Sequence, residues 1–219
     1  SWILNIDIIL NNSTFDFRRN FLRCIIAQTN HLKRNIRFEK DYAKKIVILT
    51  SIILSGLVFK EYEDNYKLGI RELELLVKNF FDNEGFPLTR NPDDLFFFSK
   101  YLILCREVIK DSQKYVPEFL EDIVEKNIFC LNFIKTPNGQ LPLFNGSRIT
   151  DLNQIEKYLN NGKKKKSNKP IGGLLKIEHG THLIYLDIGK PPQKKFSKCY
   201  QSGPLSLEYF IDGLKIISN

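Results

Sequence analysis

The sequence predicts two successive parts, a helical region followed by an antiparallel β region. Three observations predict this order. Through roughly the first 150 residues, apolar residues recur every three or four positions, as in a helix. After about residue 172 they recur at every second position, as in a strand. A polar stretch with a lysine run lies between the two patterns. We therefore expect a helical domain over residues 1–150, a linker over 151–171 and the start of a β domain over 172–219.

The helical region is predicted to hold five amphipathic helices joined by short breaks. They are expected over approximately residues 17–32, 42–59, 65–81, 92–109 and 118–134. In the first helix Phe17, Phe21 and Ile25 share one face, whereas the second is apolar nearly all round and is predicted to be central. Asn91 precedes the fourth helix as its N-cap, with Pro92 at the first helical position. Consecutive helices of this kind are typical of hairpins stacked into a ring or solenoid.

The last third of the chain carries strand signals. Strands are predicted over residues 174–177, 182–188, 205–211 and 214–217. Asp212-Gly213 lies between the last two and is a strong signal for a two-residue hairpin turn. A short helix is expected over 152–159. Residues 160–170, which include four consecutive lysines, are expected to form a solvated loop, with polyanion binding as the alternative.

The overall composition limits the class of protein. With 42% hydrophobic residues the chain can form a core and is not intrinsically disordered, and four cysteines in 219 residues exclude a disulfide scaffold. No cysteine and histidine spacing typical of zinc is present. The longest apolar run, residues 46–59, is shorter than the roughly 20 residues that span a bilayer. The chain has no methionine and starts and stops in apolar runs, so we expect it to be part of a longer protein.

The formal charge leaves the partner open. A charge of +8, from 33 basic and 25 acidic side chains, is compatible with nucleic acid, an anionic lipid or an acidic polysaccharide. A composition rich in Lys, Asn and Ile is equally basic without any such partner. No basic and aromatic motif typical of nucleic-acid binding is present, so we expect no nucleic-acid partner.

Five short segments, taken in order, point to a family. They are residues 29–32 (TNHL), 83–92 (NEGFPLTRNP), 137–146 (PNGQLPLFNG), 180–192 (GTHLIYLDIGKPP) and 202–208 (SGPLSLE). By their order and spacing they resemble the heparinase II/III-like family, most closely its poorly characterised bacterial branch. The resemblance covers most of the chain. It implies an incomplete N-terminal (α/α) toroid of helical hairpins followed by the first strands of an antiparallel β-sandwich.

The resemblance also implies an activity. Members of the family are polysaccharide lyases, which cleave a uronic-acid-containing polymer by β-elimination. The reaction removes a weakly acidic C5 proton beside a carboxylate whose charge must be neutralised, and a proton returns to the leaving oxygen. The implied partner is an acidic polysaccharide or glycosaminoglycan-like glycan. No cofactor or metal is expected, and the implied location is the periplasm or cell envelope.

Candidate site residues follow from the positions that match the family's motifs. Asn30 and His31 match an Asn-His pair, with Asn30 on the substrate carboxylate and His31 as base or neutralising group. The alternative for this pair is an exposed polar surface on a basic helix. Arg90 is expected to bind a carboxylate bidentately. Asn91 is either a further substrate contact or simply the helix cap.

Two positions depart from the family's pattern. Asp94 stands about where characterised lyases carry a tyrosine, which makes Tyr101 the nearest candidate for the catalytic phenol, with core packing as its alternative. Gln201 stands where many relatives carry histidine. Glutamine can hydrogen-bond a sugar but cannot act as a base. These departures favour a second hypothesis, a non-catalytic carbohydrate-binding or cell-envelope scaffold of the same fold. A third is a helical-repeat module for protein interaction.

Overall fold

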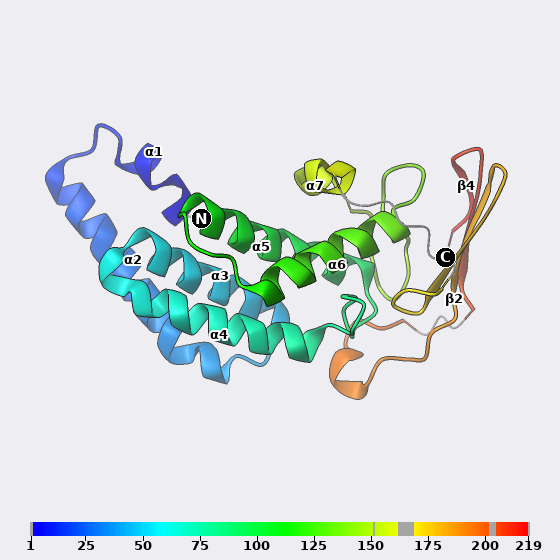
Figure 1. Ribbon diagram of the computed structural model, residues 1–219, viewed down its shortest axis with the longest axis horizontal. Coiled ribbons are helices and arrows are strands. Elements are labelled where there is room, and N and C mark those ends of the chain that lie inside the picture. Colours follow the sequence, from blue (N-terminus) through cyan, green and yellow to red (C-terminus); the bar gives the residue numbers. More distant parts are fainter. Residues whose placement is uncertain (1, 151, 162–168, 202–204, 219) are drawn as a thin grey trace. The chain divides into compact units, whose positions relative to one another are not determined.

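The computed structural model describes residues 2–150, 152–161, 169–201 and 205–218 (Figure 1). The predicted lysine run at residues 163–166 and the beginning of segment 202–208 lie outside these ranges. The described residues form seven α-helices followed by four strands in one antiparallel sheet. This order confirms the predicted fold class.

The helices and strands are close to their predicted positions. The helices are α1 (Ile6–Leu10), α2 (Phe15–Asn35), α3 (Tyr42–Val58), α4 (Glu63–Phe80), α5 (Pro92–Asp111), α6 (Glu118–Ile134) and α7 (Glu156–Asn161). The strands are β1 (Leu174–His179), β2 (His182–Asp187), β3 (Leu207–Ile211) and β4 (Leu214–Ile217). The five predicted helices correspond to α2 through α6, and the predicted short helix to α7. Among the described residues, no helix combines the length and apolar character needed to cross a bilayer.

Packing divides the chain into two compact units. The first comprises Ser1–Leu76 and Leu104–Val116, and the second Val77–Ile103 and Pro117–Asn219. This partition groups α6 and the first half of α5 with the sheet, whereas the change in composition placed a boundary near residue 150. Periodicity identifies the apolar face of a helix but not the neighbour that covers it.

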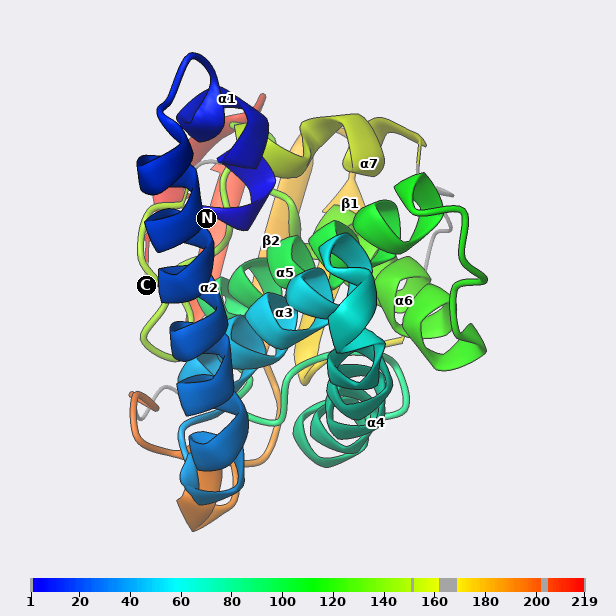
Figure 2. The same cartoon turned by 90° about the vertical axis from the view of Figure 1, so that its left-hand side faces the viewer.

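In the first unit α3 is the most buried helix. Four of its side chains have no exposed surface: Ile46, Leu49, Ile52 and Ile53. This burial confirms what its apolar sequence predicted. Asp41 caps the start of α3 by accepting a hydrogen bond of 2.9 Å from the backbone N–H of Ala43. The neighbouring α2 packs alongside α3 (Figure 2), where Ile25 and Leu54 share one apolar cluster.

Two glycines allow α4 to approach α3 closely within this unit. A Cβ atom placed on Gly56 of α3 would overlap the backbone nitrogen and Cα of Tyr66 on α4. A Cβ atom placed on Gly69 of α4 would instead meet the side chain of Ile53 at 2.5 Å. The first contact is with backbone, whereas the second is mainly with the side chain of the buried Ile53. The spacing of the two helices therefore depends most on Gly56.

In the second unit the sheet has the strand order β1-β2-β3-β4, with every neighbouring pair antiparallel. The predicted hairpin between β3 and β4 is confirmed, because Asp212 and Gly213 both have positive φ, at 49° and 81°. These angles match a tight two-residue turn, which closes the hairpin with the twist that antiparallel strands need.

The two faces of the sheet differ in burial. Tyr185 and Phe210 are fully buried on one face, and the Tyr185 hydroxyl donates to the backbone oxygens of Phe133 and Lys135 at 3.3 and 3.0 Å. These hydrogen bonds attach β2 to the end of α6. Side chains of the opposite face, such as Ile177, are apolar and about half exposed. An apolar open face is the kind that a second sheet covers in a β-sandwich, in agreement with the expected architecture.

The close approach of α3 and α4 generates a stability prediction. Gly56→Ala is expected to lower the free energy of unfolding by about 1–3 kcal/mol, because the added methyl group forces the two backbones apart. Gly69→Ala is the matched control and is expected to cost less, since its backbone contacts, at 3.3 and 3.5 Å, are longer than those of Gly56 and alanine favours helix over glycine by about 1 kcal/mol. Urea unfolding of both variants measures the difference. Equal losses would contradict the assignment of the constraint to Gly56.

Candidate functional site

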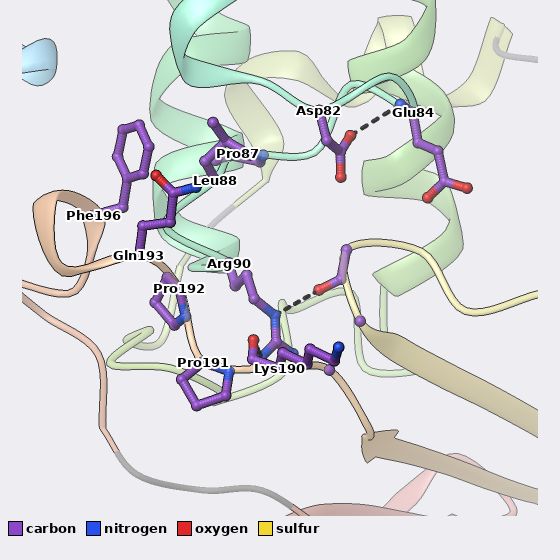
Figure 3. Close-up of a pocket in the computed structure, with 13 residues that line it drawn as sticks. Asp82, Glu84, Pro87, Leu88, Arg90, Lys190, Pro191, Pro192, Gln193 and Phe196 are labelled. Atoms are coloured by element: carbon purple, nitrogen blue, oxygen red, sulfur yellow. Dashed lines mark hydrogen bonds between the residues drawn. The ribbon is translucent and has the colours of Figure 1, made fainter.

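A pocket of about 350 Å³ opens within the second unit (Figure 3). One wall comes from the connection between α4 and α5, residues 82–90, and another from the stretch after β2, residues 189–196. Gly172 and Gly173, just before β1, complete the lining. Two of the segments that carry the family resemblance, separated by about 100 residues in the sequence, therefore meet at this pocket.

Arg90 lies at the centre of this junction, and protein acceptors engage its guanidinium group. Nε donates to the backbone oxygen of Gly172 at 3.1 Å, and one terminal nitrogen donates to the backbone oxygen of Lys190 at 2.8 Å. The other terminal nitrogen forms a buried ion pair with Asp187, a residue with no exposed surface. All three nitrogens of the fork thus bind the protein itself. This geometry favours a structural role for Arg90 over the bidentate substrate contact predicted from the sequence.

Glycines provide the space for this guanidinium group. A Cβ atom placed on Gly189 would overlap the guanidinium carbon of Arg90, and one on Gly173 would lie 2.5 Å from a terminal nitrogen. Gly173 also has a φ of 81°, a value that other residues rarely adopt. The glycines on both sides of Arg90 are therefore required by the close approach of its side chain.

The backbone of Arg90 is in the left-handed region, with a φ of 58°. This conformation is uncommon for a residue other than glycine and costs of order 1 kcal/mol or more. Hydrogen bonds on both sides of the residue support it: the Arg90 N–H donates to Pro87 at 2.9 Å, and its oxygen accepts from the Asn145 amide at 2.9 Å. The conformation turns the side chain toward Asp187 immediately before α5 begins.

Further polar contacts join the other segments of the resemblance. Asp93, in the first turn of α5, accepts hydrogen bonds from the Ser147 and Thr150 hydroxyls at 2.9 and 2.6 Å. Glu208 on β3 is fully buried and accepts from the backbone N–H of Leu143 at 3.0 Å and from Lys215 at 2.8 Å. Hydrogen bonds and ion pairs thus connect four of the segments that carry the resemblance into one polar framework beside the pocket. These are the described parts of residues 83–92, 137–146, 180–192 and 202–208.

Two carboxylates stand on one side of the pocket. Asp82 Oδ1 accepts hydrogen bonds from the backbone N–H groups of Glu84 and Phe86 at 2.9 and 2.8 Å, which fixes the turn after α4. Burial raises the pKa of Asp82 from its ordinary value, with these hydrogen bonds opposing the rise. Glu84 is exposed at the rim. Among the described residues, no group of three or more His, Cys, Asp or Glu side chains is arranged to hold a metal ion.

Asn30 and His31 belong to the first unit, on α2. Asn30 is half-buried and lines a cavity of about 10 Å³, room for about one water molecule, together with Ser55 and Asn65. His31 is exposed, and the Asn35 amide nitrogen lies 3.5 Å from both of its ring nitrogens. The pair thus divides into an inward amide and an outward imidazole, as adjacent helical positions require.

The remaining predicted residues lie in the second unit. Asn91 is buried, and its side-chain oxygen accepts a hydrogen bond of 2.8 Å from the Asp93 N–H, which confirms its capping role. Tyr101 is half-buried on α5, with its ring 5.1 Å from that of Phe97. Gln201 is exposed at the edge of the described chain.

Sequence reasoning missed the acidic residues that organise this region. Asp187 and Glu208 are charged residues at inward-facing positions of β2 and β3. A charged residue at an inward position of a strand requires a partner, because an unpaired buried charge is costly. In both strands, a charged residue at a position where the alternation predicts an apolar one was the signal that could have identified Asp187 and Glu208. Asp82, by contrast, carries no pattern that distinguishes it from an ordinary turn residue.

Comparison with known proteins supports the fold through structure alone. No family model matches the chain, and no curated relative matches it. The crystal structure of a heparinase III aligns with 99% of this chain at a TM-score of 0.79 and 14% identity. Heparan sulfate lyase HepC from Pedobacter heparinus aligns with 94% of it at a TM-score of 0.69 and 21% identity. The chain covers 41% and 37% of the lengths of these two structures. It therefore has the fold of the corresponding part of heparinase III.

The buried pair of Arg90 and Asp187 predicts a large effect of mutation. Arg90→Ala is expected to cost about 3–5 kcal/mol in the free energy of unfolding, because it leaves Asp187 charged, buried and unpaired. The double variant Arg90→Ala/Asp187→Ala is expected to lose less than the sum of the two single variants. Lys126→Ala removes an exposed pair with Asp122 and is expected to cost under about 1 kcal/mol. Urea unfolding of all four variants measures these losses. If the loss in the double variant equalled the sum of the two single losses, the coupling between Arg90 and Asp187 would be contradicted.

The raised pKa of Asp82 predicts a pH dependence of stability. The folded state holds this proton more tightly than the unfolded state, so the associated stabilisation is full below about pH 4 and is lost as the pH rises through the raised value. Asp82→Asn keeps an acceptor for the turn but cannot ionise. Its melting temperature relative to the parent protein is therefore expected to rise from acidic to neutral pH. A relative loss of stability at neutral pH would refute this.

Proposed function

We propose that this protein, which has the fold of heparinase III, is a polysaccharide lyase that cleaves an acidic, uronic-acid-containing polysaccharide by β-elimination. The observation that carries the proposal is the likeness to solved heparinase III and heparan sulfate lyase structures over 93–99% of the chain. The proposed location, the periplasm or cell envelope, follows from the resemblance to the heparinase II/III-like family.

The charge of α2 and the turn after it supports an acidic substrate. Residues 15–38 contain one acidic side chain, Asp16, and six basic ones: Arg18, Arg19, Arg23, Lys33, Arg34 and Arg37. Arg19, Arg23 and Arg34 are exposed and recur at helical spacing, and the half-buried Asn30 lies on the same side of the helix between Arg23 and Arg34. Arginine is suited to carboxylate and sulfate groups because its fork matches their oxygen geometry.

The proposed chemistry assigns roles to the groups on this helix. Asn30 and Arg34 bind the uronate carboxylate and stabilise the charge that develops when the C5 proton leaves. His31, exposed beside them, takes that proton as the general base. Arg90 is left out of this group, because its guanidinium nitrogens bind Gly172, Lys190 and Asp187.

A second candidate function is a non-catalytic glycan-binding or cell-envelope scaffold. One observation favours it: Asp94 stands where characterised lyases carry tyrosine, and its carboxylate accepts a hydrogen bond of 2.7 Å from the Thr89 hydroxyl. Asp94 is thereby fixed next to the α5 N-terminus rather than offering a phenol to substrate. Binding of an acidic polysaccharide without cleavage is the outcome this alternative expects.

An absorbance assay for unsaturated uronate product across a panel of acidic polysaccharides tests the proposal. The wild-type protein is expected to release product from at least one of them. His31→Ala is expected to lower kcat/KM by roughly 100- to 10,000-fold, the usual contribution of a general base. Arg34→Ala is expected to lower kcat as well as raise KM, because the proposed role of Arg34 is to bind the carboxylate and to stabilise the charge that develops in the transition state. His179→Ala removes another exposed imidazole, on β1, and serves as the matched control with unchanged kinetics.

The absence of product from every polymer, with salt-sensitive binding retained, would overturn the lyase and support the scaffold. Product formation that is insensitive to His31→Ala would keep the lyase but reject this residue as its base.

A further inference from the structure

The pocket in the second unit has the size of a small-ligand site. Its volume of about 350 Å³ is within the range of roughly 300–1,000 Å³ usual for such sites, and suits one or two sugar rings. All of its lining residues belong to the same compact unit.

The net charge of the lining does not favour an anion. Its charged side chains, among the described residues, are Asp82, Glu84, Arg90 and Lys190. The buried carboxylate of Asp187 offsets the positive charge of Arg90. Two carboxylates then remain against the single ammonium of Lys190. A uronate or sulfate group in direct contact with this lining would be repelled, whereas hydroxyl and ammonium groups would donate hydrogen bonds to the carboxylates.

Several polar groups of the lining have spare hydrogen-bonding capacity. Asp82 Oδ2, unlike Oδ1, accepts no hydrogen bond from the described residues. The side chains of Glu84 and Gln193 likewise make no hydrogen bond or ion pair within the described part of the chain, and both are exposed. These groups are available to the hydroxyl groups of a ligand without first breaking a contact within the protein.

Apolar surface stands across from the carboxylates. In Figure 3, Asp82 and Glu84 lie on one side of the pocket, and Pro191, Pro192 and Phe196 on the other. A sugar ring has an apolar C–H face as well as a hydroxyl edge, so it matches a site with apolar rings on one side and acceptors on the other. Phe196 is held in place by the ring of Phe80, at 6.1 Å between centroids.

We propose that this pocket binds an uncharged or amino-bearing sugar ring, and not the anionic sugar of the polymer. The proposal rests on the proposed function and refines it. In a polysaccharide that alternates a uronate with an uncharged or amino sugar, the pocket takes the second kind of unit. Glu84 and Gln193 contact its hydroxyl or amino groups, while Pro191 and Pro192 contact its C–H face.

Binding of simple sugars to the whole chain tests the proposal directly. N-acetylglucosamine, glucosamine and glucuronate are titrated separately while amide NMR signals of Gly172, Gly173 and Gly189 are followed. The first two sugars are expected to shift these signals, and glucuronate is expected to leave them unchanged. Tighter binding of glucuronate or of inorganic sulfate would overturn the proposal. A failure of both other sugars to shift the signals up to their solubility limit would overturn it as well.

Variants at the pocket rim separate recognition from folding. Glu84→Gln is expected to weaken glucosamine roughly tenfold, the usual loss for a hydrogen bond to a charged group, and to weaken N-acetylglucosamine less. Gln193→Ala is expected to weaken both sugars. Lys194→Ala is the matched control, since Lys194 is exposed next to Gln193 but does not line the pocket. Unchanged affinities in Glu84→Gln and Gln193→Ala would contradict the assignment.

The outcome is distinguishable from failure of the lyase. If product forms from an acidic polysaccharide while the sugars do not bind, the pocket assignment is wrong and the lyase stands. If the sugars bind at the pocket and no product forms from any polymer, the pocket assignment stands and the catalytic proposal fails.

Discussion

The buried ion pair between Arg90 and Asp187 is the interaction on which the second unit depends. It joins the connection before α5 to the end of β2, across 97 positions of sequence. Removing two charges from water is costly, and the pair repays this cost only with further hydrogen bonds. Those bonds come from the backbone oxygens of Gly172 and Lys190 to the guanidinium group, and from the Gly189 N–H to Asp187 at 3.0 Å. A left-handed residue and two glycines are needed to bring these groups together.

This constraint separates two kinds of electrostatic environment in the chain. In the second unit the guanidinium charge of Arg90 is paired with the buried Asp187, so the neighbouring pocket presents carboxylates and apolar rings. In the first unit three arginines of α2 are exposed and lie on the same side of the helix as Asn30. One physical rule underlies this difference: a buried charge needs a partner within the protein, whereas an exposed charge is stabilised by water.

Much of the fold was predictable because it depends on local patterns. The central position of α3 followed from its continuous apolar sequence, and the turn at Asp212-Gly213 from residues that accept positive φ. The cap at Asn91 was equally local. The role of Arg90 was not predictable, because arginine in a loop looks the same whether it binds a ligand or a buried acid. Its partner Asp187 lies in a strand far along the sequence, and only folding brings them into contact.

By itself the sequence determined the order of helices and strands, the positions of caps and turns, and the set of segments that resemble one family. These properties arise from spacing and backbone preference within a few residues. The tertiary structure alone decided which segments meet, which of the candidate side chains are occupied by the protein, and where a pocket is left open. Those outcomes depend on contacts between distant residues, such as Arg90 with Asp187, and on the space that Gly173 and Gly189 leave for a guanidinium group.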